Sequence, residues 1–487
     1  MLIMLKAVHG FGQGRLYRRG LFCKHRAMFR TVEMPLWLLA LILAFAAVTF
    51  ASHFLFPSVR WFFRRRMEKV VARLNERLAH KIEPFKLLHR HDMIQRLIYD
   101  PKVIEAVAEH ARKSGLREDV AFQEARRYAR EIVPSFSATA YFGIAIRLAR
   151  WLSRGLYRVR LGHVDREAIR SIAPDATVVF VINHRSNMDY VLVTYLAADR
   201  SALAYAVGEW ARVWPLSRLI KAMGAYFIRR RSRNMLYRRV LARYVQMATA
   251  GGVAQAVFPE GGLSLDGRVG EPKLGILSYM ISAYEPGRSR DIVFVPVALN
   301  YDRVLEDRVL VAAGKSGKRK FRLRWRMAIR YVMQHFWQRL TGRFLRFGYA
   351  AVSFGAPVSL AEFVAREGTA RAQDVAEELM QRIRSIIPVL PVPLVAACLL
   401  EAEGPMSREA LHAEAERAAQ RMQAAGAHVE LMNGELAREV DLAVNHLLVR
   451  RVLSRTPRGL VVNEAERPLV EYYANSISHL LVGEKGA

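Results

Sequence analysis

Hydrophobic and polar residues divide the chain into a helical part, an alternating part and a second helical part. Charged and apolar residues repeat at helical spacing over residues 62–79 and 101–132, which predicts a helical region over 57–160. From residue 175, short β-branched runs separated by helix-like segments predict strands at 177–182, 202–207, 226–228, 253–258, 292–299 and 350–354. Strands that alternate with helices indicate an α/β fold, with a mostly parallel sheet flanked by helices over 161–358.

The pattern returns to helix beyond this sheet, so residues 359–487 are predicted to form a C-terminal helical region. A proline-rich stretch at 387–393 indicates a joint between subdomains. Residues 1–33 form a basic N-terminal segment. A glycine-rich run at 10–14 lies within it, but no strand precedes this run, so a flexible terminus is the better interpretation than a phosphate loop.

Residues 34–56 predict a transmembrane helix. These 23 residues contain no Asp, Glu, Lys or Arg, and about 20 apolar residues span a bilayer. The run ends in a proline and three arginines rather than a small-residue cleavage site, so an uncleaved anchor is favoured over a signal peptide, and over a buried core helix. The basic flanks are equal, but translation from Met28 or Met34 is a possible alternative, and a start at Met34 would leave only the downstream flank basic. We therefore expect a membrane-anchored protein whose body lies in the cytoplasm.

Composition and net charge exclude some classes of protein but do not identify the function. The chain has 487 residues and a formal net charge of +31, from 75 Lys and Arg against 44 Asp and Glu. With 52% hydrophobic residues it is neither disordered nor collagen-like, and charges spread through the interior exclude a polytopic transporter. A cationic surface suits nucleic acid, anionic lipid or phosphorylated substrates. The two cysteines, Cys23 and Cys398, are far apart in the sequence and indicate neither a disulfide framework nor a zinc site.

The strongest chemical signal is His184 followed by Asp189, in a loop between an apolar strand and an apolar helix. Open α/β sheets place their active sites at the carboxyl ends of strands. A carboxylate there can fix the tautomer of an imidazole and leave its other nitrogen as a base. Taken alone, this spacing is a weak signal and favours an ordinary loop histidine and a helix-capping aspartate.

Three further segments, at 224–230, 258–262 and 293–299, follow this one at 183–190. Their order and spacing resemble the four blocks of the glycerolipid acyltransferases, and most of all the membrane-bound bacterial glycerol-3-phosphate 1-acyltransferases. The pair Leu236-Tyr237, the run at 300–304 and the tail at 469–479 strengthen the resemblance. The blocks cover residues 183–304, and a weaker likeness runs from about residue 85 to the C-terminus.

The resemblance implies direct acyl transfer, with no serine acyl-enzyme and no cofactor or metal. His184 would deprotonate a substrate hydroxyl that attacks an acyl thioester, and Asp189 would orient His184. Glu260 would either hydrogen-bond substrate hydroxyls or hold its loop. The residues expected to bind substrate are Arg185, Ser186, Gly224, Phe227, Arg229, Arg230, Glu260, Gly261, Gly262, Arg268 and Pro296. Among these, the arginines are the expected phosphate ligands, because guanidinium matches phosphate oxygens, although for any one of them an ordinary solvated position is an equal alternative.

One departure concerns the third block. Leu263 and Leu265 stand where the family usually has arginines that grip the phosphate. Arg268 or Lys273 could replace them; otherwise the acceptor is bound differently or is not glycerol 3-phosphate. The departure affects the identity of the acceptor and not the acyl transfer.

Residues 315–346 hold 11 Lys and Arg, no Asp or Glu, and several aromatic residues. Such a helix suits an anionic lipid surface. It would also suit single-stranded nucleic acid, or simply pack with its arginines in water. The predicted membrane anchor implies a nearby bilayer and so favours the lipid interpretation, and nucleic acid is not expected as a partner.

The sequence therefore predicts a glycerol-3-phosphate acyltransferase that uses acyl-CoA or acyl-carrier protein and acylates the sn-1 hydroxyl to make lysophosphatidate. The nearest alternative is a 1-acylglycerol-3-phosphate acyltransferase that makes phosphatidate. An alternative of another class is a non-catalytic lipid- or nucleic-acid-binding protein on the same fold, which the intact His184 and Asp189 disfavour.

Overall fold

The computed structural model describes residues 35, 37–44, 83, 85, 90–197, 202–208, 216–229, 232, 234–317, 347–402, 404–429 and 435–481. The chain divides into two compact units, Met1–Leu74 and Asn75–Ala487, and the sheet belongs to the second. Several predictions fall outside the described residues: the basic segment 1–33, the helix at 62–79, Arg230, and residues 318–346 of the basic aromatic segment.

Most of the predicted transmembrane segment also lies outside the described residues. Residues 37–44 of it are helical, and Trp37, Leu41 and Leu43 are exposed. Within the described part of the chain, no helix combines the length and the apolar character that crossing a membrane requires. The membrane span therefore stays a prediction.

The second unit is built on one mostly parallel sheet, with strand order β1-β7-β6-β2-β5-β3-β4. Strand β2 pairs in parallel with β5 and β6, and β3 with β4 and β5. Strand β7 runs antiparallel to β6 and parallel to β1, while the short β8 pairs with β6. The strands are β1 (Arg158–Val164), β2 (Thr177–Ile182), β3 (Ala204–Gly208), β4 (Tyr226–Ile228), β5 (Gln255–Val257), β6 (Ile292–Tyr301), β7 (Tyr349–Phe354) and β8 (Val358–Ser359).

The fold class expected from the sequence is confirmed, and each predicted strand has a counterpart in the sheet. Strand β1 was missed, because residues up to 160 were assigned to helix. It lies at the sheet edge, where arginines are tolerated: Arg158 and Arg160 place their guanidinium groups 5.6 and 4.2 Å from the ring centroid of Tyr349. The predicted all-helical tail likewise contains an antiparallel hairpin, β9 (Leu453–Thr456) with β10 (Gly459–Val462).

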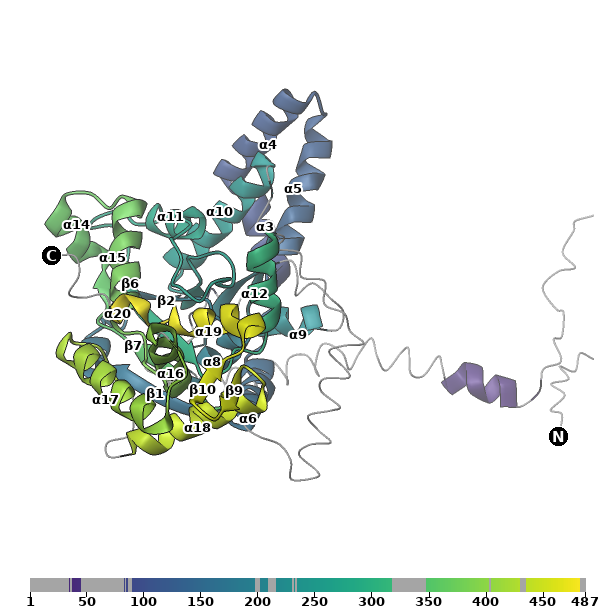
Figure 1. Cartoon of the computed structure of the whole chain (residues 1–487). Coiled ribbons are helices and arrows are strands. Elements are labelled where there is room, and N and C mark those ends of the chain that lie inside the picture. The colour runs from purple at the N-terminus through teal and green to yellow at the C-terminus, as the bar shows by residue number, and fades with distance from the viewer. Residues whose placement is uncertain are drawn as a thin grey trace, which may run out of the picture. The chain divides into compact units, whose positions relative to one another are not determined.

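Helices cover the sheet, and the pair α4–α5 extends away from it (Figure 1). Helix α4 begins with Pro101, is capped by Asp100, and ends at Gly115, whose φ of 63° lets the chain turn into α5. Before the last sheet strands the helices are α3 (Arg90–Ile98), α4 (Pro101–Ser114), α5 (Glu118–Ile132), the π-helix η1 (Thr139–Ala145), α6 (Ile146–Leu156), α7 (Arg166–Arg170), α8 (Met188–Leu196), α9 (Leu216–Ala222), α10 (Met235–Ala250), α11 (Gly275–Ile281) and α12 (Asp307–Ser316). After them come α14 (Leu360–Glu367), α15 (Ala372–Ser385), α16 (Pro391–Glu401), α17 (Arg408–Ala424), α18 (Leu436–Val449), the 3₁₀ turn η3 (Glu464–Glu466), α19 (Arg467–Ala474) and α20 (Ser478–Leu481).

The proline-rich stretch that suggested a subdomain joint is instead part of the core. Pro391 occupies the first turn of α16, where a missing N–H costs nothing and its fixed φ suits the helix. Residues 391–399 of this helix are all buried, and it packs against α17, α18 and α19. The C-terminal helices are therefore assembled around a buried apolar helix that begins with proline.

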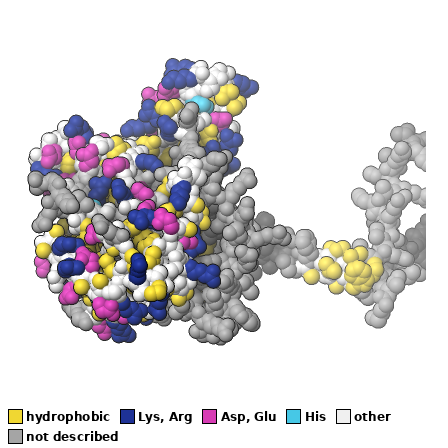
Figure 2. All heavy atoms as spheres, in the orientation of Figure 1, with side chains coloured by type: hydrophobic (Ala, Val, Ile, Leu, Met, Phe, Trp, Pro, Cys, Tyr) yellow, Lys and Arg dark blue, Asp and Glu magenta, His cyan; other side chains and the backbone are white. Residues whose placement is uncertain are grey.

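Acidic and basic side chains are interspersed over the visible face of the second unit (Figure 2). Arginines of the second unit form ion pairs near its surface, such as Arg366 with Glu378 and Arg371 with Asp374. The described charged residues on this face therefore do not form a patch of one sign.

Candidate active site

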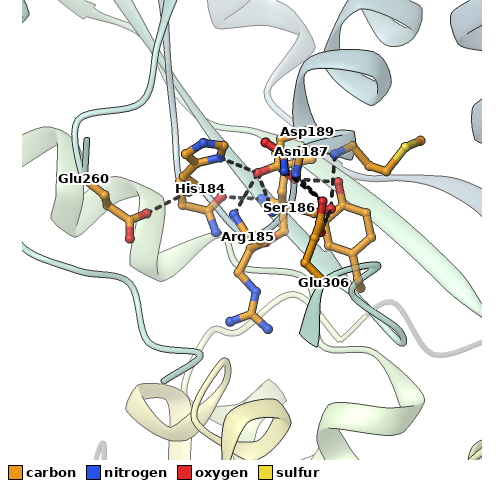
Figure 3. A network of polar contacts seen from close by, with 11 residues as sticks. His184, Arg185, Ser186, Asn187, Asp189, Glu260 and Glu306 are labelled. Carbon is orange, nitrogen blue, oxygen red and sulfur yellow. Dashed lines mark hydrogen bonds and ion pairs between the residues drawn. The ribbon is translucent and has the colours of Figure 1, made fainter. Parts of the chain in front are cut away.

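His184 and Asp189 meet at the carboxyl end of β2. His184 lies in the loop after the strand, and Asp189 lies in the first turn of α8. The imidazole Nδ1 is 2.9 Å from Asp189 Oδ2, and the two side chains are 1% and 0% exposed (Figure 3). Because a carboxylate oxygen accepts this hydrogen bond, Nδ1 carries the proton and Nε2 is left as the basic nitrogen.

The Asp189 carboxylate receives three more hydrogen bonds. The backbone N–H groups of Arg185 and Ser186 donate to Oδ2 at 2.7 and 2.9 Å, and the Tyr301 hydroxyl donates to Oδ1 at 2.6 Å. Burial, together with the Asp189 charge, raises the pKa of Tyr301 well above its usual range, so the phenol keeps its proton. Both carboxylate oxygens are thus fixed before any substrate binds.

Aromatic rings enclose the imidazole. Phe258, just after β5, lies 4.2 Å from His184 between ring centroids, and Tyr190 meets it edge-on at 5.6 Å. These rings exclude water from the side of the base, which strengthens electrostatic interactions within the site.

Glu260 holds two loops together. Its Oε1 accepts the backbone N–H of His184 at 2.8 Å, and its Oε2 accepts that of Gly270 at 3.0 Å. The loop is tied again by Ser264 N–H, which donates to the His184 carbonyl at 2.9 Å. Burial raises the pKa of Glu260 to about 7. Of the two roles considered for this residue, the structure favours holding the loop.

Glu306, which follows β6, performs the same function on the other side of the site. It accepts Ser186 Oγ–H at 2.8 Å and the Asn187 amide at 3.0 Å (Figure 3). Burial raises the pKa of Glu306. Ser186 is therefore a loop hydrogen-bonder whose hydroxyl is committed to a carboxylate.

Arg185 points away from His184, toward the C-terminal helices (Figure 3). Its side chain is 2% exposed, donates through Nη1 to the Gly267 carbonyl, and lies 4.8 Å from the ring centroid of Tyr472 on α19. Gly267 has a φ of 93°, and a Cβ there would lie 1.8 Å from the Tyr472 carbonyl oxygen. Arg185 thus fastens the C-terminal region to the third-block loop, and its role as a phosphate ligand stays a prediction.

Arg229 is engaged by a carboxylate rather than open to substrate. Its Nε and Nη2 donate to the two oxygens of Glu131 on α5 at 2.8 and 2.6 Å. The Glu131 side chain is 7% exposed and that of Arg229 is 33% exposed. Such a bidentate pair orients Arg229 strongly, so phosphate binding by this side chain would have to compete with Glu131.

A cavity of about 740 Å³ opens beside the third-block loop, between that loop, α12 and α19. Leu263 and Leu265 line it together with three cationic side chains, Arg268, Lys273 and Lys315. Two of its acids have partners outside the loop, since Glu271 pairs with Arg384 and Glu471 with Arg467. The two residues proposed to replace the missing arginines thus line one cavity, bounded by Glu260.

The other predicted substrate residues lie in strands or beside them, and Gly224 precedes β4, at the edge of the sheet opposite the one that carries His184. Phe227 is buried in β4, and Pro296 is buried in β6, where its carbonyl accepts Gly355 N–H at the break between β7 and β8. Gly224 and Gly261 have positive φ of 86° and 65°, and Gly262 lines the cavity. Their contacts with substrate stay predictions. Among the described residues, no three His, Cys, Asp or Glu side chains gather as a metal site would require.

Tyr301, Glu306 and Tyr472 were not assigned by the sequence analysis. Tyr301 and Glu306 follow a predicted buried strand, and the run at 300–304 had already contributed to the family resemblance. Their position just after that strand was the signal that could have identified them. Tyr472 lies in a tail helix that packs on the loop only through the tertiary fold, and no sequence signal indicated that contact.

The geometry defines an α/β domain with a buried histidine–aspartate pair, and comparison with known families agrees. The family profile described as "Acyltransferase" matches residues 163–300, and that described as "Glycerol-3-phosphate acyltransferase C-terminal region" matches residues 336–484. The resemblance to the glycerolipid acyltransferases is confirmed, since one profile matches residues 163–300 and the other, of the C-terminal region of glycerol-3-phosphate acyltransferases, matches residues 336–484.

Curated relatives extend the match along the chain. The glycerol-3-phosphate acyltransferase of Pseudomonas putida KT2440 is 28% identical over 80% of this chain and 49% of its own length. That of Pseudomonas fluorescens Pf-5 is 30% identical over 64% of this chain and 38% of its own. The chain thus spans about half the length of these relatives. The crystal structure of the 1-acyl-sn-glycerophosphate acyltransferase of Thermotoga maritima aligns with 60% of this chain and 91% of its own, at 18% identity and a TM-score of 0.31.

We predict that Asp189→Asn lowers kcat by about 10²–10⁴-fold, the usual contribution of positioned proton transfer. An amide cannot accept from the imidazole and both backbone N–H groups through one oxygen, and it favours the wrong tautomer. Tyr301→Phe is the matched control, because it removes one donor and leaves the imidazole bond, so about a tenfold loss is expected. Initial rates at saturating substrate measure both, with thermal melting as the check on folding. A rate for Asp189→Asn within tenfold of wild type would contradict the assignment.

We predict that the free energy of unfolding depends on pH through the protonation of Glu260. Its folded-state pKa of about 7 lies above the ordinary value of 4.5, so between these values the folded state holds a proton that the unfolded state has lost. The contribution to stability is complete at low pH and is lost as the pH rises through about 7. Glu260→Gln should flatten this decline, as measured by urea unfolding at several pH values between 5 and 8. Parallel pH profiles for the two proteins would show that the Glu260 proton plays no part.

Proposed function

We propose that this chain transfers an acyl group from a thioester to the sn-1 hydroxyl of glycerol 3-phosphate, an early step of phospholipid synthesis. The observation that carries the proposal is the buried His184–Asp189 pair at the end of β2, with the carboxylate held by donors from two segments. The similarity to glycerol-3-phosphate acyltransferases over 80% of the chain supports the choice of substrate.

The geometry suits direct transfer. His184 Nε2 takes the proton of the attacking hydroxyl as its oxygen bonds to the thioester carbonyl carbon, and the Nδ1–H bond to Asp189 stabilises the imidazolium that forms. Collapse of the tetrahedral intermediate breaks the carbon–sulfur bond. The imidazolium then returns its proton to the leaving thiolate, so the products are an ester and a free thiol. Acyl-CoA and acyl-carrier protein both supply such a thioester.

We propose that the acceptor's phosphate binds in the cavity that Arg268, Lys273 and Lys315 line. These three cations can donate hydrogen bonds to a phosphate in place of the arginines that Leu263 and Leu265 replace, although Glu260, Asp266, Glu271 and Glu471 line the same cavity. The same two leucines also favour a second candidate acceptor, lysophosphatidate, because they give the cavity apolar wall area. Purified protein supplied with labelled acyl-CoA and either glycerol 3-phosphate or lysophosphatidate should acylate glycerol 3-phosphate faster. Faster acylation of lysophosphatidate would make the second candidate correct, and no acylation of either would overturn the proposal.

We predict that Arg268→Ala raises the acceptor KM by about ten- to a hundredfold, the value of one charged hydrogen bond, while the KM for acyl-CoA changes little. Arg229→Ala serves as the contrasting variant. It should lower the melting temperature instead, because it removes the guanidinium that neutralises the buried Glu131 carboxylate. Adding Glu131→Gln should then recover stability. If Arg229→Ala with Glu131→Gln is stable yet has a high acceptor KM, the phosphate lies at Arg229 and not at Arg268.

We also propose attachment to the cytoplasmic face of the inner membrane through residues 34–56 and the basic segment 315–346. Support comes from the apolar run of the first and the 11 Lys and Arg of the second. Deleting residues 1–56 should reduce membrane sedimentation without abolishing it, and high salt should release the remainder, because screening weakens attraction to anionic lipid. A truncated protein found wholly in the supernatant at low salt would contradict the lipid role of the basic segment.

A further inference from the structure

An apolar stripe lies on the exposed face of η1 and α6. Ile144, Leu148 and Trp151 are 59%, 41% and 61% exposed, and their spacing of four and three residues places them on one side of the helix. The opposite side is buried, through Ala145, Ile146, Ala149 and Ser153. A helix that buries one face and still exposes large apolar residues on the other is expected to contact another surface through that second face.

Arginines flank this stripe. Arg147, Arg150 and Arg154 are all exposed on α6, and residues 133–164 contain five arginines and no Asp or Glu. Arg154 Nε donates to the Tyr195 hydroxyl at 2.9 Å, and the guanidinium of Arg150 lies 5.6 Å from the centroid of the same ring. The positive charges are therefore held beside the stripe, with no carboxylate in this stretch of sequence to neutralise them.

Two exposed apolar residues on another part of the unit have different surroundings. Ile104 and Val120, on the helical pair α4–α5, are 46% and 43% exposed, but Glu105 and Asp119 adjoin them in sequence. That surface is mixed in charge. An apolar stripe beside arginines that form no ion pair with another described residue thus distinguishes α6 from α4–α5, which makes α4–α5 a matched control.

We propose that this face of α6 docks on the surface of a bilayer that contains anionic phospholipid. Large apolar side chains enter the boundary between headgroups and acyl chains, Trp favours that boundary, and arginines beside them meet phosphate groups. An anionic bilayer satisfies all three features of the face together, whereas an apolar protein partner would leave the arginines unpaired. The proposal does not depend on the acyl transfer proposed above.

Docking through α6 would place the catalytic domain close to lipid. Helix α6 packs against α8, which carries Asp189 in its first turn, and Figure 1 shows the two helices in the same part of the unit. The helix that carries half of the histidine–aspartate pair would then lie next to the surface where acylated products partition.

The test is site-specific, because other segments of the full chain also attract lipid. Cys398 is buried, so Cys23→Ser with Leu148→Cys provides one reactive thiol for an environment-sensitive dye, and Cys23→Ser with Ile104→Cys provides the matched control. The full chain is bound to vesicles of phosphatidylcholine and phosphatidylglycerol that carry brominated acyl chains. We expect several-fold stronger quenching at position 148 than at position 104. Equal quenching at the two positions would overturn the proposal, and so would a dye at 148 that is shielded before vesicles are added, since another part of the chain or a second copy would then cover the face.

Charge is tested separately. Arg147→Gln with Arg150→Gln should weaken the quenching at position 148 by about fivefold or more in phosphatidylglycerol vesicles, since each basic residue near an anionic surface contributes roughly fivefold in affinity. Lys102→Gln with Arg112→Gln removes the same charge from α4 and should leave quenching unchanged. Equal effects of the two double variants would show that only net charge matters and would overturn the assignment to α6.

Discussion

The structure of the site depends on one buried carboxylate. Asp189 is 0% exposed, yet it is satisfied completely, by the His184 imidazole, two backbone N–H groups of its own loop and the hydroxyl of Tyr301 on β6. A buried charge left without such donors would cost several kcal/mol. The loop after β2, the end of β6 and the start of α8 are therefore held in one arrangement by a single side chain, and that arrangement is the one in which His184 Nε2 is basic.

The order of the strands in the sheet brings the segments of this site together. Strand β2 lies between β5 and β6, so the loops that follow all three strands meet at one edge. Glu260, after β5, and Glu306, after β6, each accept N–H or O–H groups of the loop at 183–187. Two buried carboxylates thus fix the loop from opposite sides while Asp189 fixes it from within. The C-terminal region adds a third support through the stacking of Arg185 on Tyr472.

Local pattern was enough to predict the alternating strands and helices, and the approach of His184 to Asp189, because both depend on residues close in sequence. Strand β1 was missed because its arginines are tolerated only at a sheet edge, which local pattern does not reveal. Arg185 and Arg229 were expected to meet phosphate, but they contact Tyr472 and Glu131, 287 and 98 positions away in the sequence. Guanidinium groups bind carboxylates, carbonyls and rings as readily as phosphate, so residue type alone could not select the partner.

The central claim is that His184 is the base in acyl transfer to glycerol 3-phosphate, and its most direct test is the initial rate of the purified full chain with His184→Ala. Alanine removes the imidazole and leaves the backbone N–H that Glu260 accepts, so the loop keeps its support. We predict that acylation of glycerol 3-phosphate falls by at least about 10²-fold while the melting temperature stays close to that of the wild type. A folded His184→Ala protein that acylates glycerol 3-phosphate at close to the wild-type rate would contradict the account.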